Sequence, residues 1–306
     1  MPGVGPAAVP AIPEQAGADP EFLIAERMIH CWPICPIPEA KAAPGQIRTA
    51  VTRKNHSQGK ERGNMKLHII RHGDPDYARD TLTERGWREA ELLAKRTEKM
   101  GISAFYISPL GRAQDTASLT LRRLGAQGET LEWLREFAPV RFDPDKGRES
   151  VVWDWLPARW TLEKAYYDRE AWQHTPVMEQ AGVPGENARV CGGLDALLAR
   201  HGYTREGEIY RADRPNRESI ALFCHFGVEC VILGHLLGIS PMPLWHGTCA
   251  LTTSVTTLAT EERRPGQAYF RMYAFSDVSH LTAAGAEPSF SARFCETWDC
   301  AEERHD

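Results

Sequence analysis

The sequence predicts an α/β fold, a three-layer α/β/α sandwich around a mostly parallel sheet. From residue 66 to about residue 275, short apolar or β-branched runs alternate with segments whose apolar residues recur every three or four positions. The first pattern is typical of buried strands and the second of helices that pack on a core. Strands that alternate with helices form parallel sheets covered on both faces, and such sheets bind ligands beyond the carboxyl ends of their strands.

The first predicted strand, residues 66–70, delivers three unusual residues to a turn at 74–75. These residues are Arg71, His72 and Gly73. The planar guanidinium of arginine matches the geometry of phosphate, and a neutral imidazole can attack phosphorus. Glycine lets the backbone approach a ligand without a Cβ in the way. The strand therefore ends in a candidate phosphate-binding loop.

Caps and apolar stripes predict three helices. The first runs from the N-cap Thr83 to a stop at Gly101, and the second from the N-cap Ser108, with proline next, to Gly125. The third covers residues 228–237 and is closed by a glycine. Each has apolar residues at helical spacing, so each is expected to pack against the sheet.

Further strands are predicted at 104–107, 131–137, 219–224, 254–260 and 268–275. Chemically active side chains stand at four strand exits: Arg71 with His72, Ser108 with Arg112, Glu136, and His225. Because parallel strands end at the same edge of a sheet, these side chains are expected to converge on one crevice, where two predicted helix N-termini also point. Helix N-termini favour anions. The pattern predicts a phosphate or sulfate pocket with a nucleophile and an acid, and it requires no metal.

Composition excludes several other classes. A net charge of −5 and a pI near 6.1 give no support to nucleic acid or an anionic membrane as partner. No apolar run reaches the length of a membrane span. The 8 cysteines include no C-x-x-C pair, so we expect reduced thiols and a cytoplasmic location.

Six motifs, in order and over about residues 65–282, resemble the histidine phosphatase superfamily, in its phosphoglycerate-mutase-like branch. They are RHG (71–73), LTERGWREA (82–90), SPLGRAQDTA (108–117), CHFG (224–227), TTSVTTL (252–258) and FSDVSHL (275–281). The sequence departs from the family in three places. CHFG replaces the more usual Ser-His-Gly-Gly, Asp115 stands where Gln is common, and Asp-Pro follows RHG.

The resemblance implies a role for each residue that matches a motif. His72 would be the phospho-accepting nucleophile, and Arg71, Arg112 and His225 would hold the phosphoryl oxygens. Glu136 matches the family's proton donor, with Asp74 and Asp143 as rivals for that role. His72, Glu136 and His225 form the expected catalytic set, and no metal or other cofactor is expected.

The implied activity is metal-independent hydrolysis of a phosphomonoester through a phosphohistidine intermediate. The expected partner is a small phosphorylated metabolite, and a homodimer is left open. A phosphoglycerate-mutase-type phosphotransferase is the alternative enzyme. A phospholigand-binding module without turnover is the alternative outside enzymes.

The chain is expected to divide into an extension (1–64), a histidine phosphatase domain (65–285) with a cap insertion at about 138–218, and a C-terminal tail (286–306). The extension is rich in Pro, Ala and Gly or polar and basic, so it is expected to be disordered. The insertion is rich in aromatic and basic residues. The resemblance implies that it caps the pocket and selects the substrate, whereas most of its aromatics are expected simply to pack on the sheet.

Other histidines and cysteines have simpler interpretations. His68 and His72 lie on one face of a strand but too far apart for one metal ion, and Cys224 faces away from His225. His235 is interpreted as a core histidine and His280 as bonded to backbone. The same structural reading applies to His174, His201 and His246.

Overall fold

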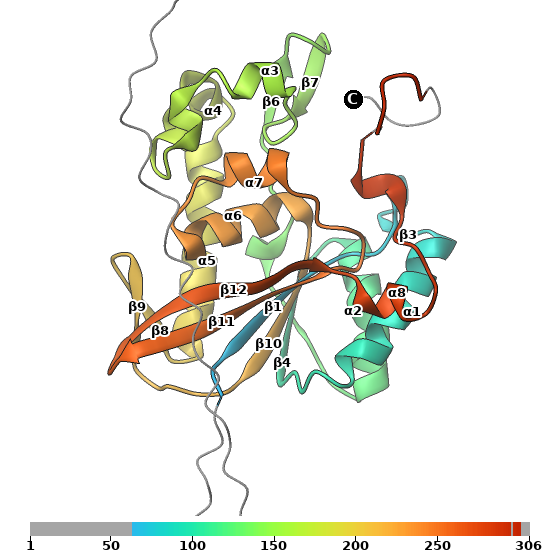
Figure 1. Cartoon of the computed structure of the whole chain (residues 1–306), viewed down its shortest axis with the longest axis vertical. Helices are drawn as coiled ribbons and strands as arrows, with labels where there is room; N and C mark the ends of the chain where they lie inside the picture. Colours follow the sequence, from blue (N-terminus) through green and yellow to red (C-terminus); the bar gives the residue numbers. More distant parts are fainter. Residues whose placement is uncertain (1–62, 295, 301–306) are drawn as a thin grey trace, which may run out of the picture. The chain divides into compact units, whose positions relative to one another are not determined.

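A computed structural model describes residues 63–294 and 296–300 (Figure 1). Nearly all of the expected extension 1–64 lies outside the described residues. An eight-stranded sheet has the order β5-β4-β10-β1-β11-β12-β9-β8. Its strands are β1 Lys66–Arg71, β4 Ala104–Ile107, β5 Glu129–Thr130, β8 Tyr203–Glu206, β9 Ile209–Ala212, β10 Ser219–Cys224, β11 Val255–Arg264 and β12 Gln267–Asp277.

The sheet is parallel where the site is built. β1 pairs in parallel with β10, β10 with β4, and β4 with β5. On the other side of β1 the pairings are antiparallel. The predicted α/β fold with a central sheet between helices is confirmed. The carboxyl ends of β1, β4 and β10 consequently open on the same edge.

Helices cover both faces of the sheet (Figure 1). α1 (Glu84–Thr97) and α2 (Gly111–Leu124) pack on one face, and α5 (Val183–Arg200) and α6 (Phe226–Leu237) lie on the other. The shorter helices are α3 Pro157–Trp160, α4 Pro176–Gln180, α7 Pro241–Gly247 and α8 Ser279–Thr282. No helix among the described residues is both long and apolar enough to cross a membrane.

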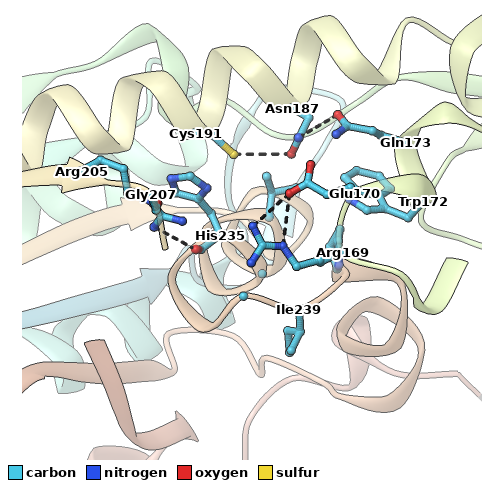
Figure 2. Close-up of a pocket in the computed structure, with 14 residues that line it drawn as sticks. Arg169, Glu170, Trp172, Gln173, Asn187, Cys191, Arg205, Gly207, His235 and Ile239 are labelled. Carbon is cyan, nitrogen blue, oxygen red and sulfur yellow. Dashed lines mark hydrogen bonds and ion pairs between the residues drawn. The ribbon is translucent and has the colours of Figure 1, made fainter. Parts of the chain in front are cut away.

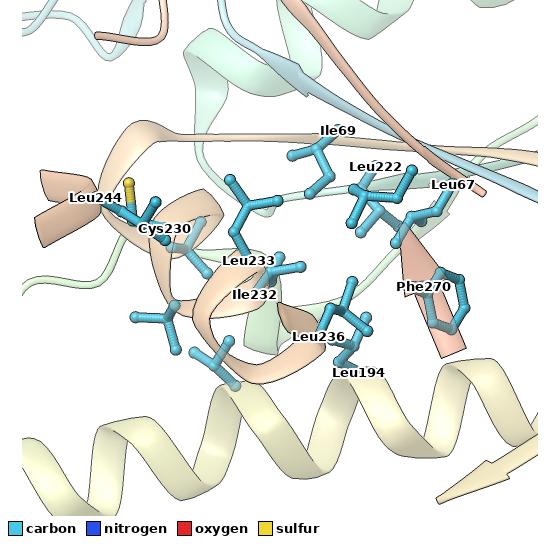
Figure 3. Packing of buried hydrophobic residues seen from close by; sticks show 14 of the residues in the cluster. Leu67, Ile69, Leu194, Leu222, Cys230, Ile232, Leu233, Leu236, Leu244 and Phe270 are labelled. Carbon is cyan, nitrogen blue, oxygen red and sulfur yellow. The ribbon is translucent and has the colours of Figure 1, made fainter. Parts of the chain in front are cut away.

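Alternation along the strands divides the core between the two faces. Leu67 and Ile69 of β1 lie in one cluster with Leu233 of α6 (Figure 3), whereas Ile70 lies in the cluster with Leu93 of α1. Successive strand residues face opposite ways, so one strand that is buried on both faces serves both layers. Each such fully buried side chain stabilises the fold by about 2 kcal/mol. This two-sided packing holds β1, and with it the loop after Arg71, in place.

One predicted strand and several predicted boundaries are wrong. Residues 131–137 do not form a strand, because β5 ends at Thr130 and a 3₁₀ turn η1 (Glu132–Leu134) follows. Leu134 and Phe137 are both fully buried and lie three residues apart, which is a helical spacing. The sequence LEWLREF predicts a strand because that spacing is not obvious among its other apolar residues. The second helix starts at Gly111, with Leu110 as N-cap, and not after Ser108.

α6 also begins earlier than predicted, at Phe226 with His225 as its N-cap. The strand 219–224 and the strand 104–107 have the predicted bounds. The two last strands are longer than predicted and extend into the turn between them, as a hairpin joined near Gly266.

The long segment between η1 and β10 contains structure of several kinds. It holds the hairpin β6 (Val140–Asp143) and β7 (Arg148–Val151), α3, the 3₁₀ turns η2 (Lys164–Tyr167) and η3 (Ala171–His174), α4, α5 and the strands β8 and β9. The β8–β9 hairpin joins the main sheet through β12. In Figure 1, β6, β7, α3 and α4 form a group beyond α7.

Two short strands and a C-terminal segment support the first loop. β2 (Pro75–Asp76) pairs with β3 (Thr81–Leu82). The hydroxyl of Ser289, just before the 3₁₀ turn η4 (Phe290–Ala292), donates to Asp74 Oδ1 at 2.5 Å, and its backbone N–H donates to Glu89 Oε1 at 2.9 Å. Thr83 Oγ1 donates to Asp74 Oδ2 at 2.6 Å. Asp74 thus ties the loop after His72 to two other segments.

Candidate active site

The expected residues meet at the carboxyl edge of the parallel strands. A pocket of about 460 Å³ opens there. Its lining includes Arg71, His72, Tyr77, Glu136, Arg148, Trp153, Phe226 and Trp245. Arg112 and His225 contact the same cluster through the ring of His72. Ser108 joins them through the ring of His225, so all six side chains predicted at the strand exits are brought together, from four separate segments of the chain.

His72 is held in one tautomer. Its Nδ1 lies 2.7 Å from the carbonyl oxygen of Gly73, which can only accept, so Nδ1 carries the proton and donates it. Arg112 Nε lies 3.3 Å from His72 Nε2 and can only donate, so Nε2 carries the lone pair. Burial, aided by the charges of Arg71 and Arg112, holds the pKa of His72 well below its usual value. The ring is therefore neutral, with Nε2 as its nucleophilic atom.

Arg112 is itself fixed by a carboxylate. Asp80 Oδ1 accepts from Arg112 Nη1 at 2.6 Å, and the other oxygen, Oδ2, accepts from the backbone N–H of Gly111 at 2.7 Å. Asp80 has a positive φ of 48°, a left-handed conformation that aspartate tolerates better than most residues. A Cβ on Gly111 would lie 2.0 Å from the carbonyl oxygen of Asp80, so only glycine fits there.

Arg71 lies deeper, with one polar edge left without a partner. Its Nη1 donates to the carbonyl oxygen of Ala250, and its Nε is buried without a hydrogen bond among the described residues. Its Cζ lies 5.9 Å from the ring centroid of Phe226. A buried guanidinium N–H of this kind is costly unless an anion accepts from it.

His225 is buried beside His72, with ring centroids 5.1 Å apart. Its Nε2 lies 2.7 Å from Ser108 Oγ, whereas its Nδ1 is buried and has no partner in the described part of the chain. Burial and the neighbouring ring of His72 hold the pKa of His225 well below its usual value. Ser108 thus orients this ring, and its Oγ also accepts from the backbone N–H of Leu110 at 3.3 Å, although α2 itself begins at Gly111.

Glu136 lies at the N-terminus of α6. Its Oε1 accepts from the N–H groups of Phe137 at 2.8 Å and Val228 at 2.9 Å, and its Oε2 accepts from Gly227 at 3.3 Å. Burial raises its pKa against these N–H groups and the charge of Arg112. A Cβ on Gly227 would lie 2.7 Å from Glu136 Oε1, so the glycine of CHFG makes room for this carboxyl group.

The two rival carboxylates are placed differently. Neither Asp74 nor Asp143 lines the pocket of about 460 Å³. Hydrogen bonds from Ser289 and Thr83 overcome burial and lower the pKa of Asp74. Backbone N–H groups and the charge of Arg141 lower the pKa of Asp143. Asp143 and Arg141 form a buried ion pair at 3.1 Å. Both are bound in structural contacts and are poorer proton donors than Glu136.

Three features of the site were not anticipated from the sequence. Asp80 anchors Arg112, and Phe226 places a ring at the pocket wall where the resembling family has glycine. The third is Glu229, whose residue is only 1% exposed and whose pKa burial raises to about 7. The sequence did hold an indication of Glu229, because it is a carboxylate within the otherwise apolar run VECVILGHLL.

The departures from the family have local consequences. The carboxylate of Asp115 accepts from the hydroxyl of Thr81 and so supports β3. Asp74 ties the first loop to Thr83 and Ser289, as described above. Among the described residues, no group of three or more His, Cys, Asp or Glu side chains has an arrangement that could hold a metal ion.

The remaining histidines of the described part of the chain have structural contacts. His68 bridges Thr257 Oγ1 and Ser219 Oγ, each at 3.0 Å. The prediction that His280 bonds backbone is wrong, because its Nε2 lies 3.1 Å from Thr253 Oγ1. The others are bound to Glu179 (His174), Tyr106 and Glu218 (His201), Asp195 (His235), and the Met242 carbonyl oxygen (His246).

A separate cavity of about 310 Å³ lies against α5 and α6 and shares no lining residue with the pocket around His72 (Figure 2). Its Arg169 donates to Glu170 at 3.0 Å and to Glu208 at 2.5 Å. Arg205 donates to the carbonyl oxygen of His235 at 3.3 Å. Both arginines are already bound by neighbouring groups, so we assign no ligand there.

Comparison with known proteins places the chain in a family. A search of curated proteins found no match. A phosphoserine phosphatase from Entamoeba histolytica, crystallised as a mutant with phosphoserine, has 19% identity and a TM-score of 0.47 over 71% of this chain and 99% of its own. A mycobacterial glucosyl-3-phosphoglycerate phosphatase has 19% identity and a TM-score of 0.46 over 69% of this chain and 98% of its own.

The family model described as "Histidine phosphatase superfamily (branch 1)" matches residues 67–270, well over half of the 306 residues. The match includes the tripeptide at 71–73, the start of α2, η1 and the start of α6. The chain belongs to branch 1 of the histidine phosphatase superfamily and is a phosphatase of that family.

Proposed function

We propose that this enzyme hydrolyses a small phosphomonoester without a metal ion, through a phosphohistidine on His72. The observation that carries the proposal is the neutral His72 ring, whose unprotonated Nε2 faces the side chain of Arg112 at 3.3 Å. The nucleophilic Nε2 of His72 and the guanidinium of Arg112, which can bind an anion, are therefore next to each other. Glu136, with its raised pKa, lines the same pocket.

In the first step, the Nε2 lone pair of His72 attacks phosphorus and the bond from phosphorus to the alcohol oxygen breaks. Arg71, Arg112 and the free Nδ1 of His225 supply donors for the phosphoryl oxygens. Such fixed donors provide most of the catalysis in phosphoryl transfer. The leaving oxygen takes its proton from Glu136, so no free alkoxide is released.

In the second step, Glu136 works as a base. Its carboxylate takes a proton from water, the water oxygen attacks phosphorus, and the P–N bond breaks to return neutral His72 and inorganic phosphate. While the phosphohistidine exists its ring is positively charged, and the Gly73 carbonyl oxygen that accepts from Nδ1 at 2.7 Å stabilises that charge. Glu136 ends the cycle protonated, as it began.

Cysteine chemistry suits a cytoplasmic location, which we include in the proposal. Cys191, Cys224 and Cys230 are free thiols. Burial raises the pKa of Cys191 to about 12, and it raises the pKa of Cys224 and Cys230 well above the usual value. Inert thiols of this kind are typical of proteins in a reducing compartment.

The test is phosphate release from a panel of phosphate esters by the purified enzyme. We expect release without a bisphosphorylated primer and without loss of activity in EDTA. Turnover that requires such a primer and returns a phosphorylated isomer would establish the mutase alternative. Stoichiometric binding of the esters without release of phosphate would establish a phospholigand-binding module. Activity lost in EDTA and restored by a metal ion would contradict the metal-independent mechanism.

A further inference from the structure

A second cavity adjoins the catalytic pocket. It has a volume of about 410 Å³ and shares five wall residues with the pocket around His72. The shared residues are Trp153, Asp154, Phe226, Trp245 and Phe294. Two cavities with a common wall of four aromatic rings can hold two parts of one ligand. We propose that the second cavity binds the alcohol part of the substrate, and that this part is an uncharged apolar group carrying a ring. The inference rests on the proposed phosphatase function.

The wall of the second cavity is mostly apolar, and its three charged side chains, Lys146, Asp154 and Arg293, have ion-pair partners. Beyond the shared rings it includes Trp155, Leu156 and Pro157. The Lys146 ammonium donates to Asp154 at 2.8 Å, so these two wall charges neutralise each other. A leaving group with its own carboxylate or ammonium would gain no new partner from the Lys146–Asp154 pair and would lose its water. The third charged wall residue, Arg293, is already paired with Glu296 at 3.4 Å, although its buried Nε has no hydrogen bond among the described residues. An apolar ring would replace water at no such cost.

The aromatic walls are held in place by their own polar atoms. The indole N–H groups donate to backbone carbonyl oxygens: Trp153 to Phe137 at 2.5 Å, Trp155 to Val152 at 2.6 Å and Trp245 to Gly227 at 3.0 Å. With these donors used, the indoles offer the cavity ring carbons rather than N–H groups. A rigid surface of this kind binds an apolar group without first having to be ordered.

Phe226 connects the two cavities. It directly follows His225, its ring centroid lies 5.9 Å from the guanidinium carbon of Arg71, and it meets Trp153 edge to face at 6.1 Å. Its ring therefore begins at the phosphate-binding side chains and continues into the second wall. The glycine that is more usual at this position in the resembling family would leave this part of the wall without a side chain.

The test compares esters whose leaving groups differ only in their remote part. The alcohols of n-propyl phosphate and 3-phenylpropyl phosphate have nearly equal acidity, so the chemical step is matched. We expect kcat/KM to be about 10- to 100-fold higher for the phenylpropyl ester, from burial of its ring. The ester whose propyl chain ends in a carboxylate should be no better than the propyl ester.

A pair of variants locates the effect. Leu156 lines the second cavity and is 45% exposed, so Leu156→Asp should leave the fold intact and place a carboxylate in the wall. It should lower kcat/KM at least tenfold more for the phenylpropyl ester than for the propyl ester. Leu162, at 81% exposed and outside the cavity, provides the control: Leu162→Asp should not change the preference.

Binding without turnover separates this inference from the proposed function. 4-Phenylbutylphosphonate and butylphosphonate replace the ester oxygen with carbon, and tryptophan fluorescence of the cavity wall reports their binding. Tighter binding of the phenyl compound, weakened by Leu156→Asp alone, supports the inference even if no ester is hydrolysed. Equal binding of both phosphonates, or equal weakening by the two variants, would overturn it even if every ester is hydrolysed.

Discussion

The side chain of Arg112 donates through Nε to Nε2 of His72 over 3.3 Å, while Asp80 holds the other end of the same guanidinium at 2.6 Å. This arrangement leaves His72 a lone pair on Nε2 and places a fixed positive charge beside it. A phosphoryl group that arrives at Nε2 meets both. Arg112 is thus linked to the nucleophile on one side and to a supporting carboxylate on the other.

We predict that Asp80→Asn lowers kcat/KM for phosphate esters about tenfold, the equivalent of roughly 1.5 kcal/mol for a weakened charge-assisted hydrogen bond. The loss should appear mainly in kcat if Asp80 orients Arg112 for the transition state. The measurement is steady-state kinetics with a melting curve. Asp76 provides the control, since it binds the exposed Arg79 in a neighbouring ion pair at 2.6 Å. Asp76→Asn with the same loss would show a general effect on the loop.

Glu136→Gln should affect esters according to their leaving groups. Esters of alkyl alcohols need a proton donor and should slow by about 10²–10⁴-fold, whereas phosphorylation of His72 by p-nitrophenyl phosphate should change far less. Hydrolysis of the intermediate would still lack its base, so a burst of p-nitrophenol followed by slow turnover is expected. Burial raises the pKa of Glu136, so the acid form persists above its usual range and is lost as pH rises further.

That loss should form the alkaline limb of the pH profile for alkyl esters, and the limb should be absent in Glu136→Gln. Stopped-flow absorbance and pH-dependent kcat/KM measure the two effects. If both ester classes slow equally and no burst appears, the proton donor is another residue. Asp74→Asn and Asp143→Asn would then be compared in the same assays.

Gly227→Ala should resemble Glu136→Gln. The added Cβ would lie 2.7 Å from both Glu136 Oε1 and Trp153 Nε1, closer than real Cβ contacts allow, so the carboxyl group must move. We expect alkyl esters to slow at least tenfold more than p-nitrophenyl phosphate. Gly247→Ala, at a position where a Cβ would meet nothing within 4 Å, is the matched control. A Gly227→Ala enzyme with the normal ratio between ester classes would exclude this steric link.

His68 should make the fold sensitive to acid. Burial first, and then the charges of Lys66 and Arg96, lower its pKa from 6.5 to about 4. Below pH 6.5 the unfolded chain takes up a proton that the folded chain refuses, so the stability from neutral His68 is complete above pH 6.5 and is lost as pH falls toward 4. The full difference is about 3 kcal/mol.

Urea unfolding at pH 7.5 and pH 4.5 measures this effect. The wild type should lose about 2–3 kcal/mol more on acidification than His68→Asn. His174→Asn, at an exposed histidine, should lose as much as the wild type. Equal losses in all three proteins would mean that His68 titrates normally in the folded state.

Arg71, His72 and His225 could be predicted from sequence because each lies at the end of a strand rich in apolar residues. β1 and β10 are buried on both faces, so their patterns fix where Arg71, His72 and His225 emerge. Glu136 lines the pocket as well, although the strand predicted at 131–137 does not form and a 3₁₀ turn lies there. Its position depends on β4 and β5 ending at the same edge, which the order of elements already implied.

The supporting contacts could not be predicted in the same way. Asp80 reaches Arg112 through a left-handed backbone conformation and a close approach to Gly111, neither of which follows from local residue pattern. Ser108 has the chemistry of an N-cap, and only the position of His225, 117 residues later, decides that its hydroxyl also binds that ring. Contacts between segments so far apart depend on tertiary packing rather than on local propensity.

The central claim is that phosphate passes through His72, and the most direct measurement is capture of the phosphorylated chain. Glu136→Gln enzyme is mixed with p-nitrophenyl phosphate and quenched in alkali within the burst. Peptide mass spectrometry should then find a phosphoryl group on His72, stable in alkali and lost in acid. The double variant His72→Ala, Glu136→Gln should give neither burst nor phosphopeptide, with an unchanged circular dichroism spectrum. A burst and phosphopeptide that persist without His72 would contradict the mechanism.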